Sequence, residues 1–273
     1  MEAVITRQQY ELNIKGGRTL FAPVSTFSLG DQILFEVVQR KYQEDNPDEY
    51  IEFCGHPIYY DQKKGLNWDK IFHAEETNFV TAPAAAIRFS IADEATALAE
   101  QGMFARLPYH PTWGNKAVDT DEFFVVVHLR NVRIREHKNV DRAFADVLLS
   151  ELVTNYSIDR IYLVGNDERV ESEILNVPNR VVDYRKRLTL PEIAYLCQHA
   201  GLVINKDSGI GHLAAAADCS WLLTWGIKEA RWVPKMRRVN RLRFLMEAES
   251  GIESVSFVLN RLLERLGKGK RLL

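Results

Sequence analysis

The hydrophobic positions of this chain fall into two recurring patterns, short aliphatic runs and longer stretches with apolar residues at helical spacing. In the first part, residues 19–25 (TLFAPVS) predict a strand, residues 30–45 a helix and residues 50–55 (YIEFCG) a second strand. Residues 78–101 continue this order. The alternation is that of a βαβ unit, so the sequence predicts an α/β fold with parallel strands.

A second series of strands and helices follows a segment rich in turn-forming residues. Residues 106–122 contain two prolines and a glycine, which places a domain boundary near Val118 and predicts domains 1–118 and 119–273. The run FFVVVHL at 123–129 lacks alternation, as expected for a strand buried on both faces. The later elements are expected at 142–156 (helix), 160–165 (strand), 168–175 (helix), 180–184 (strand) and about 252–266 (helix).

The richest chemical signal lies between Leu188 and Trp225. A helix opens at Leu190 and ends at Gly201, a strand covers 202–204, and a turn over 207–211 precedes a small-residue helix from His212. Two glycines in the turn, Gly209 and Gly211, let the backbone approach a ligand. Unpaired N–H groups and the helix dipole favour an anion at such a helix start, which predicts a phosphate or diphosphate site.

Simpler interpretations of the same turn remain open. Asp207 or Ser208 caps the following helix in the commonest arrangement of such residues. His212 is equally compatible with a hydrogen-bonded core histidine.

Two further segments follow predicted strands and carry charged side chains. The first is Ser28-Leu29-Gly30-Asp31, where Asp31 is either a helix cap or a functional carboxylate. The second is the loop HLRNVRIREHKNV, which is either a solvated basic loop or a source of cations at a strand end. Its basic residues are His128, Arg130, Arg133, Arg135, His137 and Lys138.

Composition limits the function classes. The chain has 273 residues, 46% hydrophobic and 26% charged, and a formal net charge of −2, so its overall charge does not favour nucleic acid as a partner. No apolar run approaches the ~20 residues of a membrane span and the start is too polar for a signal peptide, so we expect a cytoplasmic protein with at most peripheral membrane contact. The three cysteines lack metal-ligand spacing and are expected to be reduced core residues.

The order of these pieces resembles a known family. RLTLPEIAYL, an aliphatic strand, DSGIGHLAAA, and LLTWG followed by RWVP are similar to the nucleotide-sugar-binding half of family 9 glycosyltransferases, the heptosyltransferase group. The resemblance covers the second domain and reaches the first only at its opening turn. It implies the GT-B fold, in which two Rossmann-like domains with parallel sheets face a central cleft and the last helix often crosses back to the first domain.

The resemblance also implies roles for individual residues. Asp207 would contact the donor sugar, and Ser208, Gly209 and His212, with Gly211 beside them, would hold the diphosphate. In the same family a Lys in the loop after the central strand neutralises the donor phosphates, which matches Lys138, with Arg130 as the second candidate. The family's Gly-Asp pair at the first turn carries the catalytic base, here Asp31.

The chain departs from the family at two places. Asn205 and Lys206 precede Asp207, where a small residue and Asn are usual, and Lys138 is followed by Asn139 without the usual Trp nearby. The implied reaction moves a sugar, with a heptose as one candidate, from a nucleoside-diphosphate donor to a glycan, lipid-linked or other small acceptor. No metal or other cofactor is expected, because cations and a helix start already face the leaving group and no Asp-x-Asp pair occurs.

Two other functions fit the same residues. One is a catalytically idle nucleotide-sugar-binding protein that kept the donor half. The other is an epimerase of the same architecture, for which His128 and His137 are the acid and base candidates.

Overall fold

The computed structural model describes the regular elements of the C-terminal half in detail, together with shorter stretches of the first part. The described residues are 3–5, 22–23, 29–45, 47, 80–82, 88–89, 91–107, 111–113, 122–130, 139–165, 180–226, 230–237, 241–244 and 252–267.

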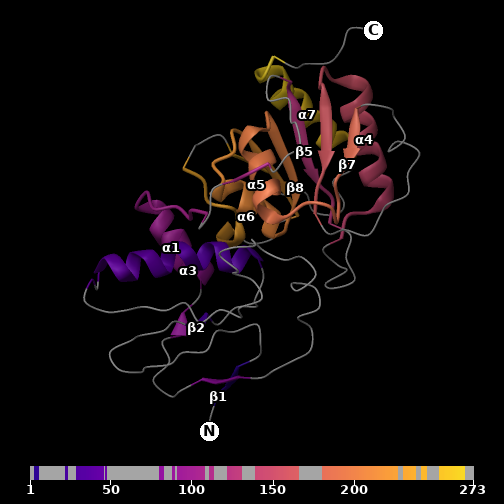
Figure 1. Ribbon diagram of the computed structural model, residues 1–273. Coiled ribbons are helices and arrows are strands. Elements are labelled where there is room, and N and C mark those ends of the chain that lie inside the picture. The colour runs from indigo at the N-terminus through magenta and orange to yellow at the C-terminus, as the bar shows by residue number, and fades with distance from the viewer. Residues whose placement is uncertain are drawn as a thin grey trace.

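A parallel sheet of six strands forms the core of the C-terminal half (Figure 1). Its order is β10-β9-β8-β5-β6-β7, and each neighbouring pair is parallel. From β5 the chain builds outward to β7 and then returns through a helix to β8 on the opposite side of β5. The order therefore reverses between β5 and β8, and ligands of open parallel sheets bind beyond the carboxyl ends of strands at such a point. The strands are β5 (Phe124–His128), β6 (Arg160–Leu163), β7 (Val181–Asp183), β8 (Leu202–Lys206), β9 (Leu222–Trp225) and β10 (Arg241–Phe244).

Helices cover both faces of this sheet. Helices α5 (Leu190–His199) and α6 (Gly209–Ala216) bury apolar side chains against one face, in a core that includes Val126 and Val203. Helices α4 (Arg142–Asn155) and α7 (Ile252–Arg265) pack on the other face, in a core that includes the alternate strand residues Val125 and Val127. Because successive strand residues point to opposite faces, the aliphatic run of β5 supplies both cores.

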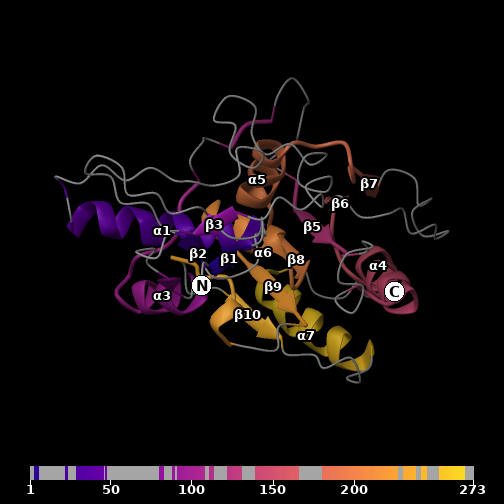
Figure 2. The same cartoon turned by 90° about the horizontal axis from the view of Figure 1, so that it is seen from below.

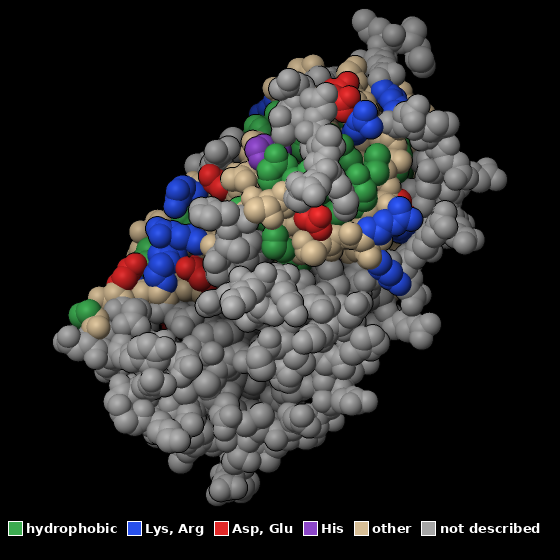
Figure 3. All heavy atoms as spheres, viewed as in Figure 1, with side chains coloured by type: hydrophobic (Ala, Val, Ile, Leu, Met, Phe, Trp, Pro, Cys, Tyr) green, Lys and Arg blue, Asp and Glu red, His purple; other side chains and the backbone are tan. Residues whose placement is uncertain are grey.

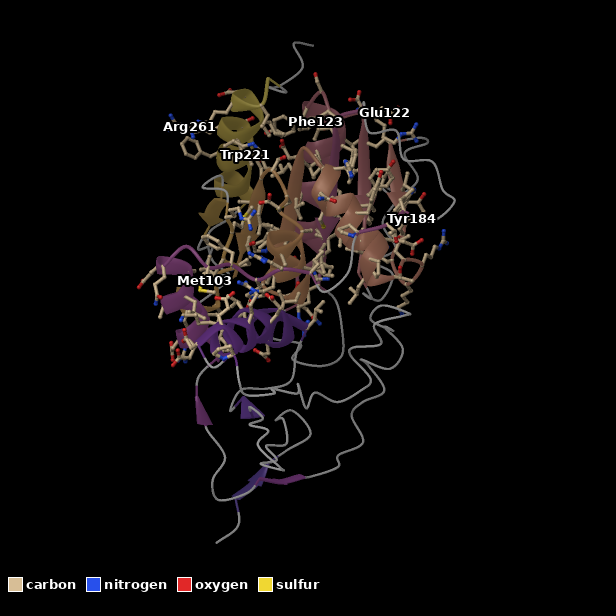
Figure 4. The ribbon with its side chains drawn as sticks, turned by 60° about the vertical axis from the view of Figure 1, so that its left-hand side comes forward. Met103, Glu122, Phe123, Tyr184, Trp221 and Arg261 are labelled. Carbon is tan, nitrogen blue, oxygen red and sulfur yellow. The ribbon has the colours of Figure 1, made fainter. Side chains whose placement is uncertain are left out.

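The described part of the N-terminal half lies at one end of the sheet. Helices α1 (Leu29–Asp45) and α3 (Ile91–Glu100) pack on each other through a core that includes Leu34 and Leu98. Residues that precede strands, Glu122, Phe123 and Trp221, lie at the far end of the sheet from Met103, which follows α3 (Figure 4). Helices α1 and α3 are therefore located beyond the carboxyl ends of the strands. Figure 2 shows from below that the two helices lie side by side.

Four short strands complete the described N-terminal part. β1 (Ala3–Ile5) pairs antiparallel with β3 (Val80–Ala82), and β2 (Ala22–Pro23) pairs parallel with β4 (Arg88–Phe89). On the face shown in Figure 3, acidic and basic side chains of the described residues are interspersed. Along α1 this follows from pairing at helical spacing, such as Arg40 Nε to Glu36 Oε1 at 2.9 Å and Lys41 with Asp45.

Most of the predicted elements are present within one or two residues. Two predictions were wrong in detail. α6 begins at Gly209, not at His212, because Ser208 caps it and the two glycines adopt helical geometry. β8 continues through Lys206, two residues beyond its predicted end, because Asn205 and Lys206 still pair with β9.

Some predictions were incomplete or remain outside the described residues. The strand β10 was not predicted. The strand predicted at 50–55, the helix at 168–175 and the boundary near Val118 lie outside the described residues. Cys197 and Cys219 are buried free thiols, as predicted, and burial raises the pKa of Cys197 well above its usual value. No helix in the described ranges combines the length and apolarity needed to cross a membrane.

Candidate active site

The first turns of α1 and α6 lie against each other. A Cβ placed on Gly209 would be 2.6 Å from Leu29 Cβ and 3.0 Å from the backbone nitrogen of Gly30. A Cβ placed on Gly30 would be 2.8 Å from the His212 ring. The glycines thus allow two helix N-termini, both with partial positive charge, to meet at one place.

This contact changes the explanation of the glycines. The sequence predicted that Gly209 and Gly211 leave space for a ligand. In the structure, the space above Gly209 is filled by Leu29 and Gly30, and the space above Gly211 by the Asn205 amide and by Pro234 Cγ at 3.2 Å. Both residues are therefore required first by close packing within the protein.

Asp31 lies in the first turn of α1 and is only 3% exposed. Its neighbour Gly30 faces the His212 ring. The structure therefore brings together the carboxylate that the sequence predicts as the base and the helix start that it predicts as the diphosphate site. The roles themselves remain predictions.

Ser208 connects α6 to the sheet. Its hydroxyl accepts a hydrogen bond from Ile210 N at 3.3 Å, which caps the helix, and donates to Asn205 Oδ1 at 2.9 Å. His128 Nδ1 lies 3.0 Å from Ser208 Oγ and 3.0 Å from Asn205 Oδ1. The hydroxyl that the family resemblance assigns to the diphosphate is thus used for internal bonds, so backbone N–H groups are the stronger ligand candidates at this turn.

Of the two predicted phosphate-binding cations, the structure describes Arg130 but not Lys138. Arg130 follows β5 and is half-buried, and its carbonyl accepts from Val140 N at 2.8 Å, which ties the two ends of the basic loop together. Lys138, like Arg133, Arg135 and His137, lies outside the described residues.

Asp207 and Lys206 stand at the carboxyl end of β8. The Asp207 backbone N–H donates to Trp225 O at 2.9 Å, which fixes the start of the turn against β9. The Lys206 ammonium group lies close to Gly226, a residue with a φ of 78°. A side chain at Gly226 would be strained and would also displace this ammonium group.

The segment RWVP links the two halves of the described structure. Arg231 Nη1 pairs with Asp93 Oδ2 of α3 at 3.3 Å, and Trp232 packs against the core shared by α1 and α3. Val233 and Pro234 are buried, and Pro234 Cγ lies against Gly211 of α6. This segment therefore helps to hold α3 near the first turn of α6.

Sequence reasoning missed an ion pair at the carboxyl end of β7. Arg185 binds Asp183 through two bonds, Nε to Oδ1 at 2.9 Å and Nη2 to Oδ2 at 2.7 Å. Burial alone would raise the pKa of Asp183, but the side-chain and backbone hydrogen bonds and the charge of Arg185 lower it overall. The available sequence signal was a pair of opposite charges, Asp183 and Arg185, two residues apart at the end of a predicted strand.

Within the described ranges no group of three or more His, Cys, Asp or Glu side chains could hold a metal ion. Besides Leu29 and Ile210, the two helix starts contain three glycines, a carboxylate, a hydroxyl and a histidine. Their chemistry suits an anionic ligand and a proton acceptor.

Comparison with known proteins agrees with this geometry. Residues 144–225 match the family model of glycosyltransferase family 9 (heptosyltransferase). This part of the chain is similar to glycosyltransferase family 9. The matched residues include β8, Ser208, the whole of α6 and β9, so the predicted resemblance and enzyme class are confirmed. No curated protein matches the sequence.

Solved structures match most of the chain in fold. A glycosyl transferase of family 9 from Veillonella parvula DSM 2008 is 11% identical with a TM-score of 0.52, and the match covers 87% of this chain and 94% of that one. The E. coli heptosyltransferase WaaC with ADP is 15% identical with a TM-score of 0.50, covering 89% and 99%. At these identities the similarity establishes the GT-B fold, which confirms the predicted α/β class.

A third structure matches over a shorter length. The E. coli ADP-heptose lps heptosyltransferase II is 15% identical with a TM-score of 0.44, and the match covers 55% of this chain. The chain spans 49% of the length of that protein.

Proposed function

We propose that this protein is a metal-independent glycosyltransferase that moves a sugar from a nucleoside-diphosphate donor to an acceptor hydroxyl. The observation that carries the proposal is the contact between the start of α6 and the start of α1. α6 has no acidic residue in its first turn, whereas α1 carries the buried carboxylate of Asp31. The first suits a diphosphate and the second a base.

The proposed reaction uses these groups in one step. The diphosphate lies at the N-terminus of α6, with Arg130 or Lys138 as an additional cation. Asp31 removes the proton of the acceptor hydroxyl as its oxygen attacks the anomeric carbon, and the nucleoside diphosphate leaves with the electron pair of the broken bond. Helix N–H groups and a fixed cation stabilise the negative charge that develops on this leaving group, so no divalent ion is needed.

The neighbours suggest which substrates to test first. One structure is of a heptosyltransferase with ADP and another of an ADP-heptose lps heptosyltransferase. ADP-heptose is therefore the first donor to assay, with a lipopolysaccharide core as the first acceptor.

The test begins with binding. Calorimetric titration with ADP, UDP, GDP and CDP should identify one preferred nucleotide, and at 100 times its Kd this ligand should add about 2.7 kcal/mol of stability. Sugar transfer from the matching donor should then survive EDTA. Absence of binding by all four nucleotides would contradict a donor site, and loss of transfer in EDTA would contradict metal independence. Binding without transfer to any acceptor would favour the idle nucleotide-sugar-binding protein.

A further inference from the structure

Three buried polar side chains form a row across the centre of the sheet. His128 on β5 pairs in register with Asn205 on β8, and Asn205 pairs in register with Thr224 on β9. Their exposed fractions are 5%, 0% and 4%. Residues in register on neighbouring strands point to the same face, here the face covered by α5 and α6. The row lies at the point where the strand order reverses.

The first two members of this row are bonded to the start of α6. An amide oxygen only accepts hydrogen bonds, so His128 Nδ1 and the Ser208 hydroxyl both donate to Asn205 Oδ1, at 3.0 and 2.9 Å. The Ser208 oxygen in turn accepts from Ile210 N. The bonds therefore run from two strands through Ser208 into the backbone of the first turn of α6.

Asn205 contacts the same turn a second time. Its amide nitrogen lies against Gly211, where a Cβ would collide with it. This nitrogen is buried and has no hydrogen-bond partner among the described residues. An unpaired buried donor costs about 1–3 kcal/mol, so an aliphatic side chain would be expected here if stability alone decided the residue.

We propose that Asn205 and His128 are positioning residues, which hold the first turn of α6 in the orientation that binds the donor diphosphate. The inference rests on the proposed function. Asn205 braces the turn at Ser208 and at Gly211, and His128 fixes the Asn205 amide by donating from Nδ1. Neither side chain needs to contact the ligand, because the ligand is bound by the backbone N–H groups that the two residues orient.

Two substitutions of His128 separate positioning from simple packing. The amide nitrogen of Asn can take the place of Nδ1, whereas that of Gln reaches the place of Nε2. We expect His128→Asn to keep the affinity for inorganic pyrophosphate within about twofold of the parent. His128→Gln should lose about five- to tenfold, the scale of one hydrogen bond. Amide hydrogen exchange at residues 209–211 should accelerate in the Gln variant and not in the Asn variant.

Thr224 provides the matched control. It is the register partner of Asn205, and its buried hydroxyl has no partner among the described residues. Thr224→Val should leave pyrophosphate affinity unchanged, whereas Asn205→Ala should weaken it at least as much as His128→Gln. If His128→Gln fails to fold, Asn205→Ala carries the same comparison against Thr224→Val.

The outcomes distinguish the two proposals. Pyrophosphate binding by the parent, with equal losses for His128→Asn and His128→Gln or with no loss for Asn205→Ala, would overturn the positioning role alone. A parent protein that binds neither pyrophosphate nor any nucleoside diphosphate would overturn both the positioning role and the proposed donor site.

Discussion

The starts of α1 and α6 are similar in shape and different in chemistry. Each has a glycine that allows close approach to the other helix. α6 is capped by Ser208 and bonded to two strands, and its first turn contains no acidic residue. α1 carries a carboxylate of its own in the same helical position, Asp31. Since both N-termini attract negative charge and the first turn of α6 contains no acidic residue, an external anion is favoured at α6.

The largest expected effect comes from removing the carboxylate of α1. Asp31→Asn should lower the rate of sugar transfer by about 10²–10⁴-fold, the usual contribution of a general base, with donor affinity almost unchanged. Steady-state kinetics and nucleotide titration on the same sample measure the two quantities. Glu94→Gln is the control, because Glu94 is an exposed acid in the first turn of α3 and should be neutral. A turnover within a few-fold of the parent would reduce Asp31 to a helix-start residue.

The next largest effect is expected from removing the cation that binds the donor phosphates together with α6. Truncating the residue that binds the phosphates should weaken nucleoside-diphosphate binding by about 1.5–3 kcal/mol, the scale of a charge-assisted hydrogen bond. The family resemblance assigns this role to Lys138, with Arg130 as the second candidate. Calorimetry of Lys138→Ala and Arg130→Ala decides between them. A loss for Arg130 with none for Lys138 would show that the assignment within the loop is wrong.

Sequence reasoning succeeded where the signal was local. The uninterrupted aliphatic run of β5 and the proline at the start of α5 placed those elements almost to the residue. It also found Gly30, Asp31 and Gly209 as special positions. The helix contact that requires these glycines was not predictable, because Leu29 and Gly209, which meet there, are far apart in the chain.

The bond between His128 and Asn205 was not predictable from the sequence for the same reason. Asn205 was visible in the sequence only as a departure from the family pattern, and His128 only as part of a basic loop. Their bond depends on the register of β5 with β8, two strands separated by the whole of β6, α5 and β7. Parallel pairing of this kind is set by the complete fold, so no local pattern reports it.

The contact between the helices can be tested by filling it. Gly209→Ala should destabilise the protein by about 1–3 kcal/mol, the usual cost of overpacking, because its Cβ would meet Leu29 and the Gly30 backbone. Chemical denaturation of Gly209→Ala, Leu29→Gly and the double variant measures the coupling between them. The cost of Gly209→Ala should be smaller in the Leu29→Gly background, which lacks the Cβ that lies nearest. Equal costs in both backgrounds would show that the Leu29 side chain does not limit the space at Gly209.

The smallest expected effect concerns the Ser208 hydroxyl. Ser208→Ala removes the cap on Ile210 N and the bond to Asn205, and loss of a helix cap typically costs ~1 kcal/mol of stability. Nucleotide affinity should fall about five- to tenfold, as for His128→Gln, because the bond to Asn205 is lost while the backbone still supplies the ligand contacts. Ser208→Thr keeps the hydroxyl and should restore both stability and affinity. If Ser208→Ala instead reduced affinity a hundredfold at unchanged stability, the hydroxyl would be a direct ligand of the diphosphate. Both helix starts would then act through a side chain, Ser208 at α6 and Asp31 at α1.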